Sequence, residues 1–141
     1  MPVTPYLFLD GRCEEAIEFY KKNLGAQVGM MMRFKEAPVG PQDWHKPAPG
    51  TENKIMHACI TINGAPLFLS DGHCGGKTAF QGFALSLDAK DQTEGERMFN
   101  ALAQGGQVQQ PLIETFFAKS FGMVADKFGL GWMVIAGPKH P

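Results

Sequence analysis

Two side chains are the strongest candidates for proton transfer or for hydrogen bonding to a ligand. Histidine as a residue type has an unperturbed pKa near neutrality, so His57 is a candidate to give or take a proton under physiological conditions. Glu114 precedes Phe116 and Phe117, and a carboxyl group forced against apolar rings has a raised pKa. A structural role would explain each equally well. His57 would then be a buried ring bonded to a backbone carbonyl, and Glu114 would pair with a backbone amide or with Lys119.

Further ligand-type residues surround the glycine-rich stretch 70–76. They are Asp71, His73 and Cys74. With His57 they could form a metal site, but their spacing matches no metal-binding motif, and an ordinary linker is the alternative interpretation. Cys59, two residues after His57, could be a nucleophile on the same strand face, or a thiol packed in the core.

The overall composition excludes several classes of protein. The chain has 13 basic and 14 acidic side chains, so its net charge of −1 gives no reason to expect nucleic acid or a membrane surface as partner. A hydrophobic fraction of 44% is too high for a disordered chain. No apolar run approaches the ~20 residues of a membrane span, and no signal-peptide pattern opens the chain. Three cysteines without paired spacing indicate reduced thiols and a cytoplasmic location.

A repeated pattern predicts the elements that carry these residues. The motif x-L-x-L-D occurs at 6–10 and again at 84–88, and a stretch with helical spacing of apolar residues follows each copy, at 14–24 and 92–103. Acidic residues lie in the first turn of both predicted helices, and a glycine suited to a left-handed conformation follows each.

Three strands are predicted after each helix. They cover 27–34, 54–62 and 67–70 in the first half, and 107–112, 121–125 and 132–135 in the second. Asn63-Gly64 is a strong hairpin signal, and Asp126 to Gly129 forms the second turn. The sequence therefore predicts an α+β protein of two βαβββ modules, residues 1–72 and 78–137. Modules of about 70 residues bury little surface alone, so both are expected to form one domain over 1–141.

A proline-rich segment, residues 37–53, interrupts the first module. It has prolines at four positions and a lone Trp44, so it is predicted to be an irregular loop. Trp44 would serve in a lid over the ligand, or it would plug the edge of the sheet.

Several stretches resemble the PhnB-like branch of the vicinal oxygen chelate superfamily, which includes glyoxalase I, extradiol dioxygenases and bleomycin-resistance proteins. The stretches are Pro5-Tyr6-Leu7-Phe8, Cys13-Glu14-Glu15-Ala16, Met56-His57-Ala58, Ser70-Asp71, Glu114-Thr115-Phe116-Phe117, Phe121-Gly122-Met123-Val124 and Trp132-Met133. Phe117 is a departure, because that branch commonly has tryptophan there. The resemblance covers nearly the whole chain and implies a curved, cup-shaped mixed sheet and a homodimer.

The same resemblance implies a divalent metal held by the first and last strands of each module. The four corresponding positions here are Pro5, Phe68, Gly82 and Met133. None of these side chains is a ligand for zinc, nickel, iron or manganese, so no metal or other cofactor is predicted. Some relatives carry a demethylubiquinone methyltransferase label. That activity would need a cofactor-binding doubly wound sheet, which the modules do not offer, so the chain is not predicted to be a methyltransferase that uses S-adenosylmethionine.

These observations predict a protein that binds a small organic molecule in an apolar cup. The predicted lining is Cys59, Phe68, Ser70, Phe117, Trp132 and Met133, with Trp44 from the proline-rich loop. The alternative is a metal-independent enzyme of the superfamily that uses His57 and Glu114 for acid–base chemistry.

Overall fold

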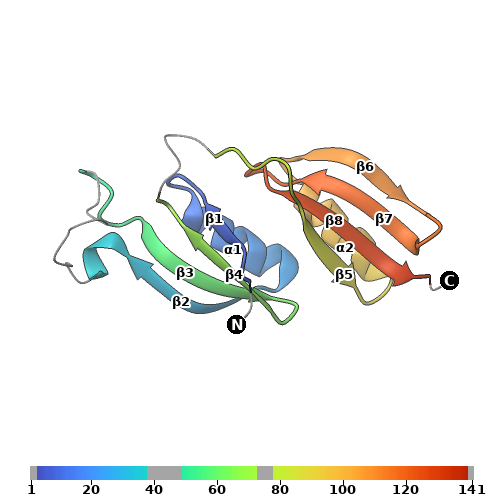
Figure 1. Cartoon of the computed structure of the whole chain (residues 1–141), viewed down its shortest axis with the longest axis horizontal. Coiled ribbons are helices and arrows are strands. Elements are labelled where there is room, and N and C mark those ends of the chain that lie inside the picture. The colour runs from blue at the N-terminus through green and yellow to red at the C-terminus, as the bar shows by residue number, and fades with distance from the viewer. Residues whose placement is uncertain (1–2, 38–48, 73–77, 140–141) are drawn as a thin grey trace. The chain divides into compact units, whose positions relative to one another are not determined.

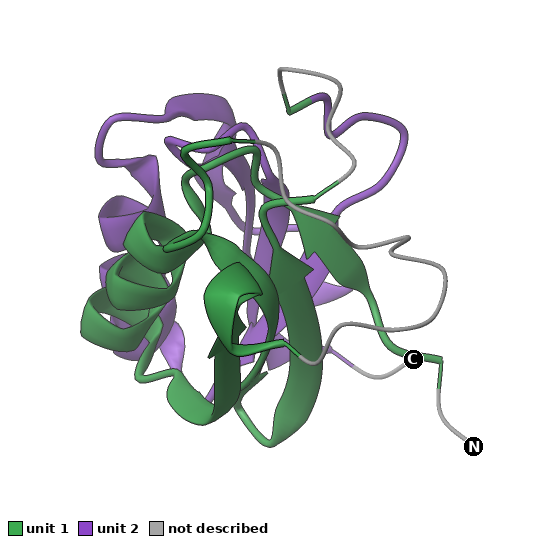
Figure 2. Cartoon of the chain, turned by 90° about the vertical axis from the view of Figure 1, so that its left-hand side faces the viewer, with its two compact units in different colours: residues 1–78 green, residues 79–141 purple. Residues whose placement is uncertain are grey.

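The computed structural model describes residues 3–37, 49–72 and 78–139. The chain divides into two compact units, residues 1–78 and 79–141, shown in separate colours in Figure 2. Each unit consists of one four-stranded mixed sheet with one α-helix against it (Figure 1). Two such units give the α+β, glyoxalase-like fold that the sequence predicts.

Unit 1 contains the first βαβββ set. Its elements are β1 (Tyr6–Phe8), α1 (Cys13–Leu24), β2 (Gln27–Arg33), a single 3-10 turn η1 (Phe34–Glu36), β3 (Ile55–Ile62) and β4 (Ala65–Ser70). The strand order is β1-β4-β3-β2, in which β1 and β4 are parallel and the other pairs are antiparallel. This order places β4 between the strand that carries Tyr6 and the strand that carries His57.

Helix α1 begins and ends as the sequence predicts. Glu14 and Glu15 lie in its first turn, where the helix dipole favours negative charge. Gly25 follows its last residue with φ 67°, the left-handed conformation that glycine adopts without strain. The helix buries a stripe of apolar residues at three- and four-residue spacing against one face of the sheet. The buried residues are Cys13, Ala16, Ile17, Phe19, Tyr20 and Leu24 from the helix, and Leu7, Ala58, Ile60, Leu67 and Leu69 from the strands.

The hairpin between β3 and β4 confirms the Asn63-Gly64 prediction. Asn63 has φ 50° and Gly64 has φ 81°. Positive φ at both central residues is the requirement of a type I′ turn, which matches the twist of the two strands. The turn fixes the register in which Cys59 lies opposite Phe68.

Unit 2 repeats the arrangement. Its elements are β5 (Leu85–Ala89), α2 (Gln92–Ala103), β6 (Gln107–Ile113), β7 (Ala118–Ala125) and β8 (Gly131–Pro138), in the strand order β5-β8-β7-β6. The side chain of Asp91 caps α2 by accepting a hydrogen bond from the Glu94 backbone N–H at 2.8 Å. In α1 a left-handed glycine directly follows the last helical residue. In α2 that place is taken by Gln104, in an extended conformation, and the left-handed Gly105 comes one residue later.

Helix α2 approaches β7 closely because one strand position has no side chain. A Cβ atom added to Gly122 would lie 2.7 Å from Phe99 Cε2 and 2.9 Å from Leu112 Cδ2. Glycine therefore allows the Phe99 ring to pack directly on the strand backbone.

The two ends of the proline-rich segment are joined at its base. The Phe34 backbone N–H donates to the Lys54 carbonyl, and the Lys35 backbone N–H donates to the Glu52 carbonyl, both at 3.0 Å. Arg33 adds a side-chain contact to this base by donating to the Asn53 carbonyl at 2.6 Å. Residues 38–48, with Trp44, lie outside the described residues, so the lid interpretation stays a prediction.

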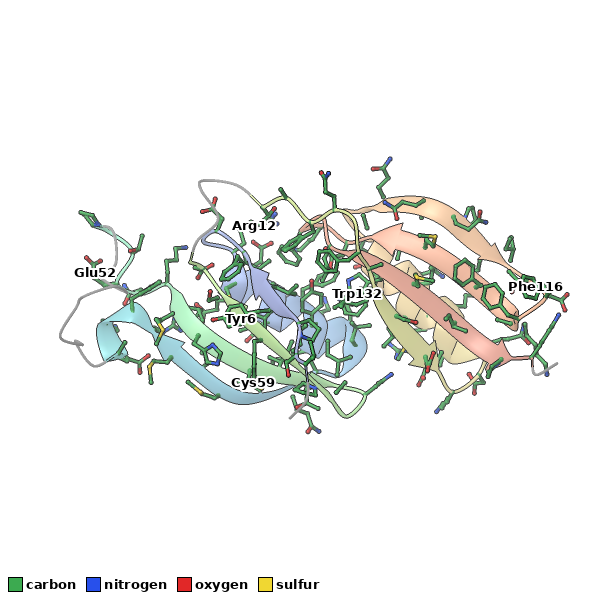
Figure 3. All side chains as sticks on the ribbon, in the orientation of Figure 1. Tyr6, Arg12, Glu52, Cys59, Phe116 and Trp132 are labelled. Carbon is green, nitrogen blue, oxygen red and sulfur yellow. The ribbon has the colours of Figure 1, made fainter. Side chains whose placement is uncertain are left out.

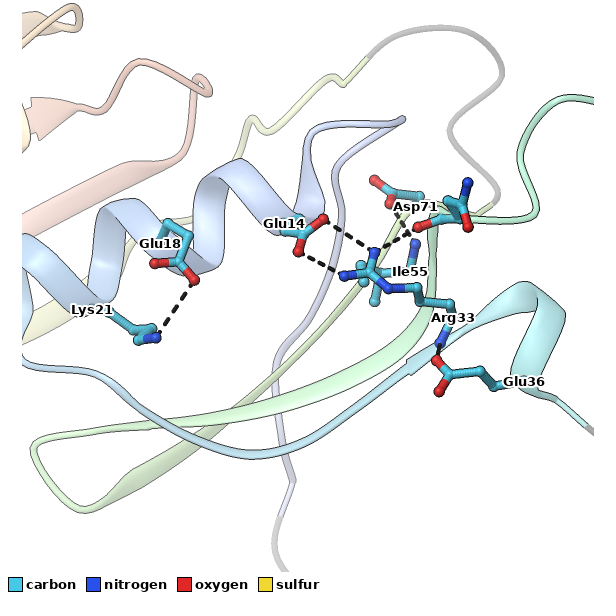
Figure 4. Close-up of polar contacts among 8 residues, drawn as sticks. Glu14, Glu18, Lys21, Arg33, Glu36, Ile55 and Asp71 are labelled. Atoms are coloured by element: carbon cyan, nitrogen blue, oxygen red, sulfur yellow. Dashed lines mark hydrogen bonds and ion pairs between the residues drawn. The ribbon is translucent and has the colours of Figure 1, made fainter.

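Arg33 also joins this base to the start of α1 (Figure 4). Its guanidinium contacts both carboxylate oxygens of Glu14, at 2.7 and 3.1 Å. The hydrogen bonds from Arg33 lower the pKa of Glu14, and the Arg33 backbone N–H in turn donates to the Glu36 carboxylate. The pair is partly exposed, so its contribution to stability is modest.

Among the described residues, no helix is both long and apolar enough to cross a membrane.

Candidate functional site

The side chains of unit 1 that the sequence identifies as candidates for proton transfer or ligand binding lie on the sheet face opposite α1. We call this the His57 face and define it by Tyr6, Phe8, His57, Cys59 and Phe68. Alternation places these side chains together, because their neighbours Leu7, Ala58, Ile60, Leu67 and Leu69 point into the core with α1. Figure 3 shows Tyr6 and Cys59 among the side chains of this sheet.

A hydrogen bond between Tyr6 and His57 is the central polar contact of the His57 face. Tyr6 Oη lies 2.9 Å from His57 Nδ1. The two residues come from β1 and β3, so the Tyr6 side chain spans the intervening strand β4. His57 is half-buried and Tyr6 is 38% exposed, so a molecule from solvent can reach the pair. His57 therefore has a side-chain partner, not the backbone carbonyl that its structural interpretation supposed.

Two aromatic rings, those of Phe8 and Phe68, lie against the pair. The Tyr6 ring centroid lies 4.9 Å from that of Phe8 and 5.9 Å from that of Phe68. The His57 ring lies 5.2 Å from the Phe68 ring and is tilted by 57° to it. Contacts of this kind fix ring orientation and leave apolar surface beside the polar atoms. Tyr6 was missed as a site residue; its signal was an x-L-x-L-D strand that carries tyrosine at an outward position.

Cys59 and Ser70 border the same face. Cys59 is half-buried. It lies opposite Phe68 of β4 on one side and opposite Met30 of β2 on the other. Met32 lies opposite His57, so thioether groups flank the polar pair on the β2 side. Ser70 is 2% exposed, and its hydroxyl accepts a hydrogen bond from the Gly72 backbone N–H. Ser70 is thus less accessible than the pocket prediction implied.

Glu114 differs from its prediction. Its carboxylate is largely exposed and forms an ion pair with Lys139. The hydrogen bond from Lys139 lowers the pKa of Glu114, whereas a raised pKa was predicted from the neighbouring phenylalanines. The partner is Lys139, where the structural interpretation named a backbone amide or Lys119, and Lys119 contributes only a smaller, through-space effect. A carboxylate in this state is ionised at neutral pH and is not a proton donor.

Trp132 also differs from its predicted place in a ligand pocket. It is 3% exposed and alternates with Val134 and Ala136 on the buried side of β8, the side that α2 covers. Its indole Nε1–H donates to the carboxylate of Asp126 at 2.9 Å. Trp132 therefore belongs to the core of unit 2, and its sequence neighbour Met133 points to the other side of the sheet.

The remaining pocket candidates of unit 2 lie on the sheet face opposite α2. Met133 is half-buried and lies opposite Met123 in the β7–β8 register. Phe117 is 37% exposed, and its ring lies 5.2 Å from the rings of both Phe116 and Phe121. These side chains give unit 2 an apolar face, on which the residues described above include no polar pair like that of Tyr6 and His57.

Asp71 has a structural task that competes with metal binding. One of its carboxylate oxygens accepts hydrogen bonds from the backbone N–H groups of Gly11, at 2.7 Å, and Cys13, at 2.9 Å. The other oxygen accepts from the Ile55 N–H at 2.8 Å (Figure 4). Both oxygens are thus engaged in joining α1, β3 and the end of β4. His73 and Cys74, the other ligands of that hypothesis, lie outside the described residues.

The donor set at the superfamily's metal positions does not fit a divalent ion. Phe68, one of the four positions, packs against the rings of Tyr6 and His57. Pro5, Gly82 and Met133 offer no imidazole, thiolate or carboxylate. Within the described ranges, no group of three or more histidine, cysteine, aspartate or glutamate side chains could hold a metal ion.

The two described cysteines should differ sharply in reactivity. Burial raises the pKa of the Cys13 thiol, and the charges of Asp71 and Glu14 raise it further, so Cys13 stays protonated at pH 8. Cys59 is half-buried on the His57 face. In a Cys74→Ser variant we expect one thiol equivalent to react rapidly with Ellman's reagent at pH 8, and the second only after denaturation.

Adding Cys59→Ser should abolish the rapid phase of that thiol titration. Two rapid equivalents in the folded protein would contradict the assignment of Cys13 as a buried, protonated thiol.

Comparisons with known structures define the class of protein. The chain is 40% identical to protein PA1353 from Pseudomonas aeruginosa, with a TM-score of 0.81 over 97% of this chain and 98% of that chain. It is 26% identical to a Bacillus cereus protein described as a putative 3-demethylubiquinone-9 3-methyltransferase, PhnB protein, with a TM-score of 0.78 over 97% and 100% of the two chains. A glyoxylase/bleomycin resistance/dioxygenase domain from Frankia sp. EAN1pec shares the fold at 16% identity, with a TM-score of 0.60 over 100% and 95%. The fold and these relatives define a PhnB-like protein of the vicinal oxygen chelate superfamily.

The family within that class follows from the sequence. Residues 1–135 match the family model described as 3-demethylubiquinone-9 3-methyltransferase. The chain belongs to this family.

Proposed function

We propose that this protein binds a small organic molecule on the His57 face of unit 1. The observation that carries the proposal is the hydrogen bond of 2.9 Å between Tyr6 and His57 within a set of aromatic rings. Small-molecule sites are typically lined by apolar and aromatic side chains, with few polar groups that fix the ligand's orientation. The His57 face has this composition, and its polar pair is accessible to solvent.

The family's methyltransferase description is not part of the proposal. The sheet of each unit has a single parallel strand pair, β1–β4 or β5–β8, with one helix packed against it. Nucleotide-derived cofactors of methyl transfer are commonly held at the strand ends of a doubly wound parallel sheet, and that architecture differs from both units. The strand topology of both units therefore favours ligand binding without this cofactor.

We also propose a cytoplasmic homodimer with small molecules, and not nucleic acids or membranes, as partners. The support is the near-zero net charge, the unpaired cysteine pattern and the number of large apolar side chains at the surface. Sedimentation velocity tests the oligomeric state; a purely monomeric species at micromolar concentration would count against it.

Acetophenone is a suitable probe of the proposed site, because it combines a planar ring with one polar atom. In the full-length, ¹⁵N-labelled chain we expect millimolar acetophenone to shift amide signals of β1, β3 and β4. We expect Phe68→Ala to weaken binding about fivefold or more, because a ring contact of Phe68 contributes about 1 kcal/mol.

Phe116→Ala provides the matched control, because Phe116 is an almost fully exposed phenylalanine of unit 2. It should leave the acetophenone affinity unchanged. Signal shifts confined to unit 2, or equal affinities of the Phe68→Ala variant and the parent chain, would contradict the proposed site.

The hydrogen-bonded pair also favours a second candidate function, a metal-independent enzyme in which His57 moves a proton. Tyr6 would orient the imidazole, as the partner of a catalytic histidine commonly does. Glu114 is left out of this candidate, because Lys139 keeps it ionised. If a substrate is found, loss of turnover in His57→Gln with retained binding would favour the enzyme over the binding protein.

A further inference from the structure

We infer that His57 presents its Nε2–H group as a hydrogen-bond donor, and that the molecule bound on the His57 face carries an uncharged carbonyl oxygen next to a planar apolar group. Tyr6 is the positioning residue that sets this state of His57. The inference rests on the proposed function and names the class of ligand.

The chemistry of the two partners sets the direction of the hydrogen bond. A phenol O–H is a stronger donor than a neutral imidazole N–H, and an imidazole nitrogen is a stronger acceptor than a phenol oxygen. Tyr6 Oη, 2.9 Å from His57 Nδ1, therefore donates its proton to that nitrogen. A neutral imidazole whose Nδ1 accepts must carry its own proton on Nε2.

The described neighbours of the His57 ring are aromatic side chains. Within the described part of the chain, no hydrogen bond or ion pair joins His57 to a carboxylate. Its ring contacts are with Tyr6, at 5.5 Å between centroids, and Phe68, at 5.2 Å. These contacts leave the ring edge that carries Nε2 as the polar part of His57 available to a ligand.

The same contacts hold the donor in place. Tyr6 and Phe68 are register partners on adjacent strands, so the His57 ring contacts two rings whose spacing is set by the β1–β4 ladder. The Nε2–H group has no hydrogen-bond partner within the described ranges. A ligand oxygen can therefore take it without displacing a protein group.

This arrangement selects for ligand chemistry. An acceptor oxygen satisfies the Nε2–H group, while the flanking rings of Phe8 and Phe68 favour a planar apolar body. A hydrogen-bond donor would take the place of the superfamily's metal as the group that contacts the ligand oxygen, at a face where Phe68 occupies a metal-ligand position.

Acetophenone and α-methylstyrene test the inference, because they differ only in C=O against C=CH₂. In the full chain we expect acetophenone to bind about fivefold more tightly, the factor that one net hydrogen bond supplies. His57→Phe keeps an aromatic ring but removes the donor, so the affinity ratio should fall to about one. Tyr6→Phe should reduce the ratio in part, because it frees the imidazole to exchange tautomers.

Ring ¹⁵N chemical shifts of His57 give a readout independent of binding. We expect Nε2 to be protonated and Nδ1 to be unprotonated in the parent chain at pH 8, and a mixture of both tautomers in Tyr6→Phe. Phe68→Leu is the control that keeps the Tyr6–His57 hydrogen bond; it should weaken both probes alike and leave the ring shifts unchanged.

The outcomes separate the two levels of the proposal. If both probes leave β1, β3 and β4 unperturbed, the proposed function fails. If both bind there with equal affinity, or if Nδ1 is the protonated nitrogen, ligand binding stands and the inference about the donor is overturned.

Discussion

Replacing Asp126 with alanine should lower the free energy of unfolding by about 3–5 kcal/mol. Asp126 is 2% exposed, and one carboxylate oxygen accepts hydrogen bonds from the backbone N–H groups of Phe128 and Leu130. Its other oxygen accepts from Trp132 Nε1, which is itself buried. Alanine would leave all three donors without this acceptor in a place where water does not replace it.

Urea denaturation measures this loss. In a Trp44→Phe background the fluorescence reports on Trp132 alone, so the transition follows unit 2. Asp126→Asn should lower the free energy of unfolding less than Asp126→Ala does, because the amide oxygen can still accept a hydrogen bond. It should still destabilise the protein, because the NH₂ group would face a donor, either the indole N–H or the backbone N–H groups. Glu96→Ala, at an exposed position of α2, is the control. A midpoint within error of the parent chain for Asp126→Ala would show that the carboxylate is not needed.

Replacing Asp71 with alanine should destabilise unit 1 by about 2–4 kcal/mol. Its carboxylate accepts three backbone N–H groups, from Gly11, Cys13 and Ile55. Asp71 is half-buried, so water can compensate in part, and we expect a smaller loss than for Asp126. The Cys13 thiol should also become easier to ionise, because the charge of Asp71 helps to raise its pKa.

Amide hydrogen exchange tests the role of Asp71 locally. The Ile55 and Gly11 amides should lose protection in Asp71→Ala, while amides of β7 and β8 should keep theirs. Asp10→Asn is a neighbouring control, at an exposed aspartate with φ 48°, a left-handed conformation that asparagine also tolerates. Unchanged exchange at Ile55 would refute the assigned contact.

Local signals made much of the fold predictable. The helices were predicted within one residue of their observed ends, because apolar spacing, acidic first turns and terminal glycines all agree. The strand order was not predicted, since β1 and β4 are distant in sequence and their parallel pairing leaves no local mark. The candidate site was predicted only in part: His57, Cys59 and Phe68 share a face by alternation alone.

The errors have a common physical cause. Trp132 and Glu114 were assigned from residue type, yet each is governed by a partner that is not adjacent in sequence: Asp126 for the tryptophan and Lys139 for the glutamate. Tyr6 was missed because its bond to His57 spans a strand that comes later in the chain. Such partners depend on register across the sheet, which residue spacing within one strand does not reveal.

The hydrogen-bonded base of the segment between Arg33 and Lys54 has an evolutionary consequence. Because Phe34 and Lys35 are already joined to Lys54 and Glu52, the sheet ends at a closed junction. The entropy of closing a loop beyond such a junction grows slowly, by about 0.6 kcal/mol for each doubling of loop length. A related chain could therefore differ in the length of this segment and keep the strand register that brings Tyr6 within reach of His57.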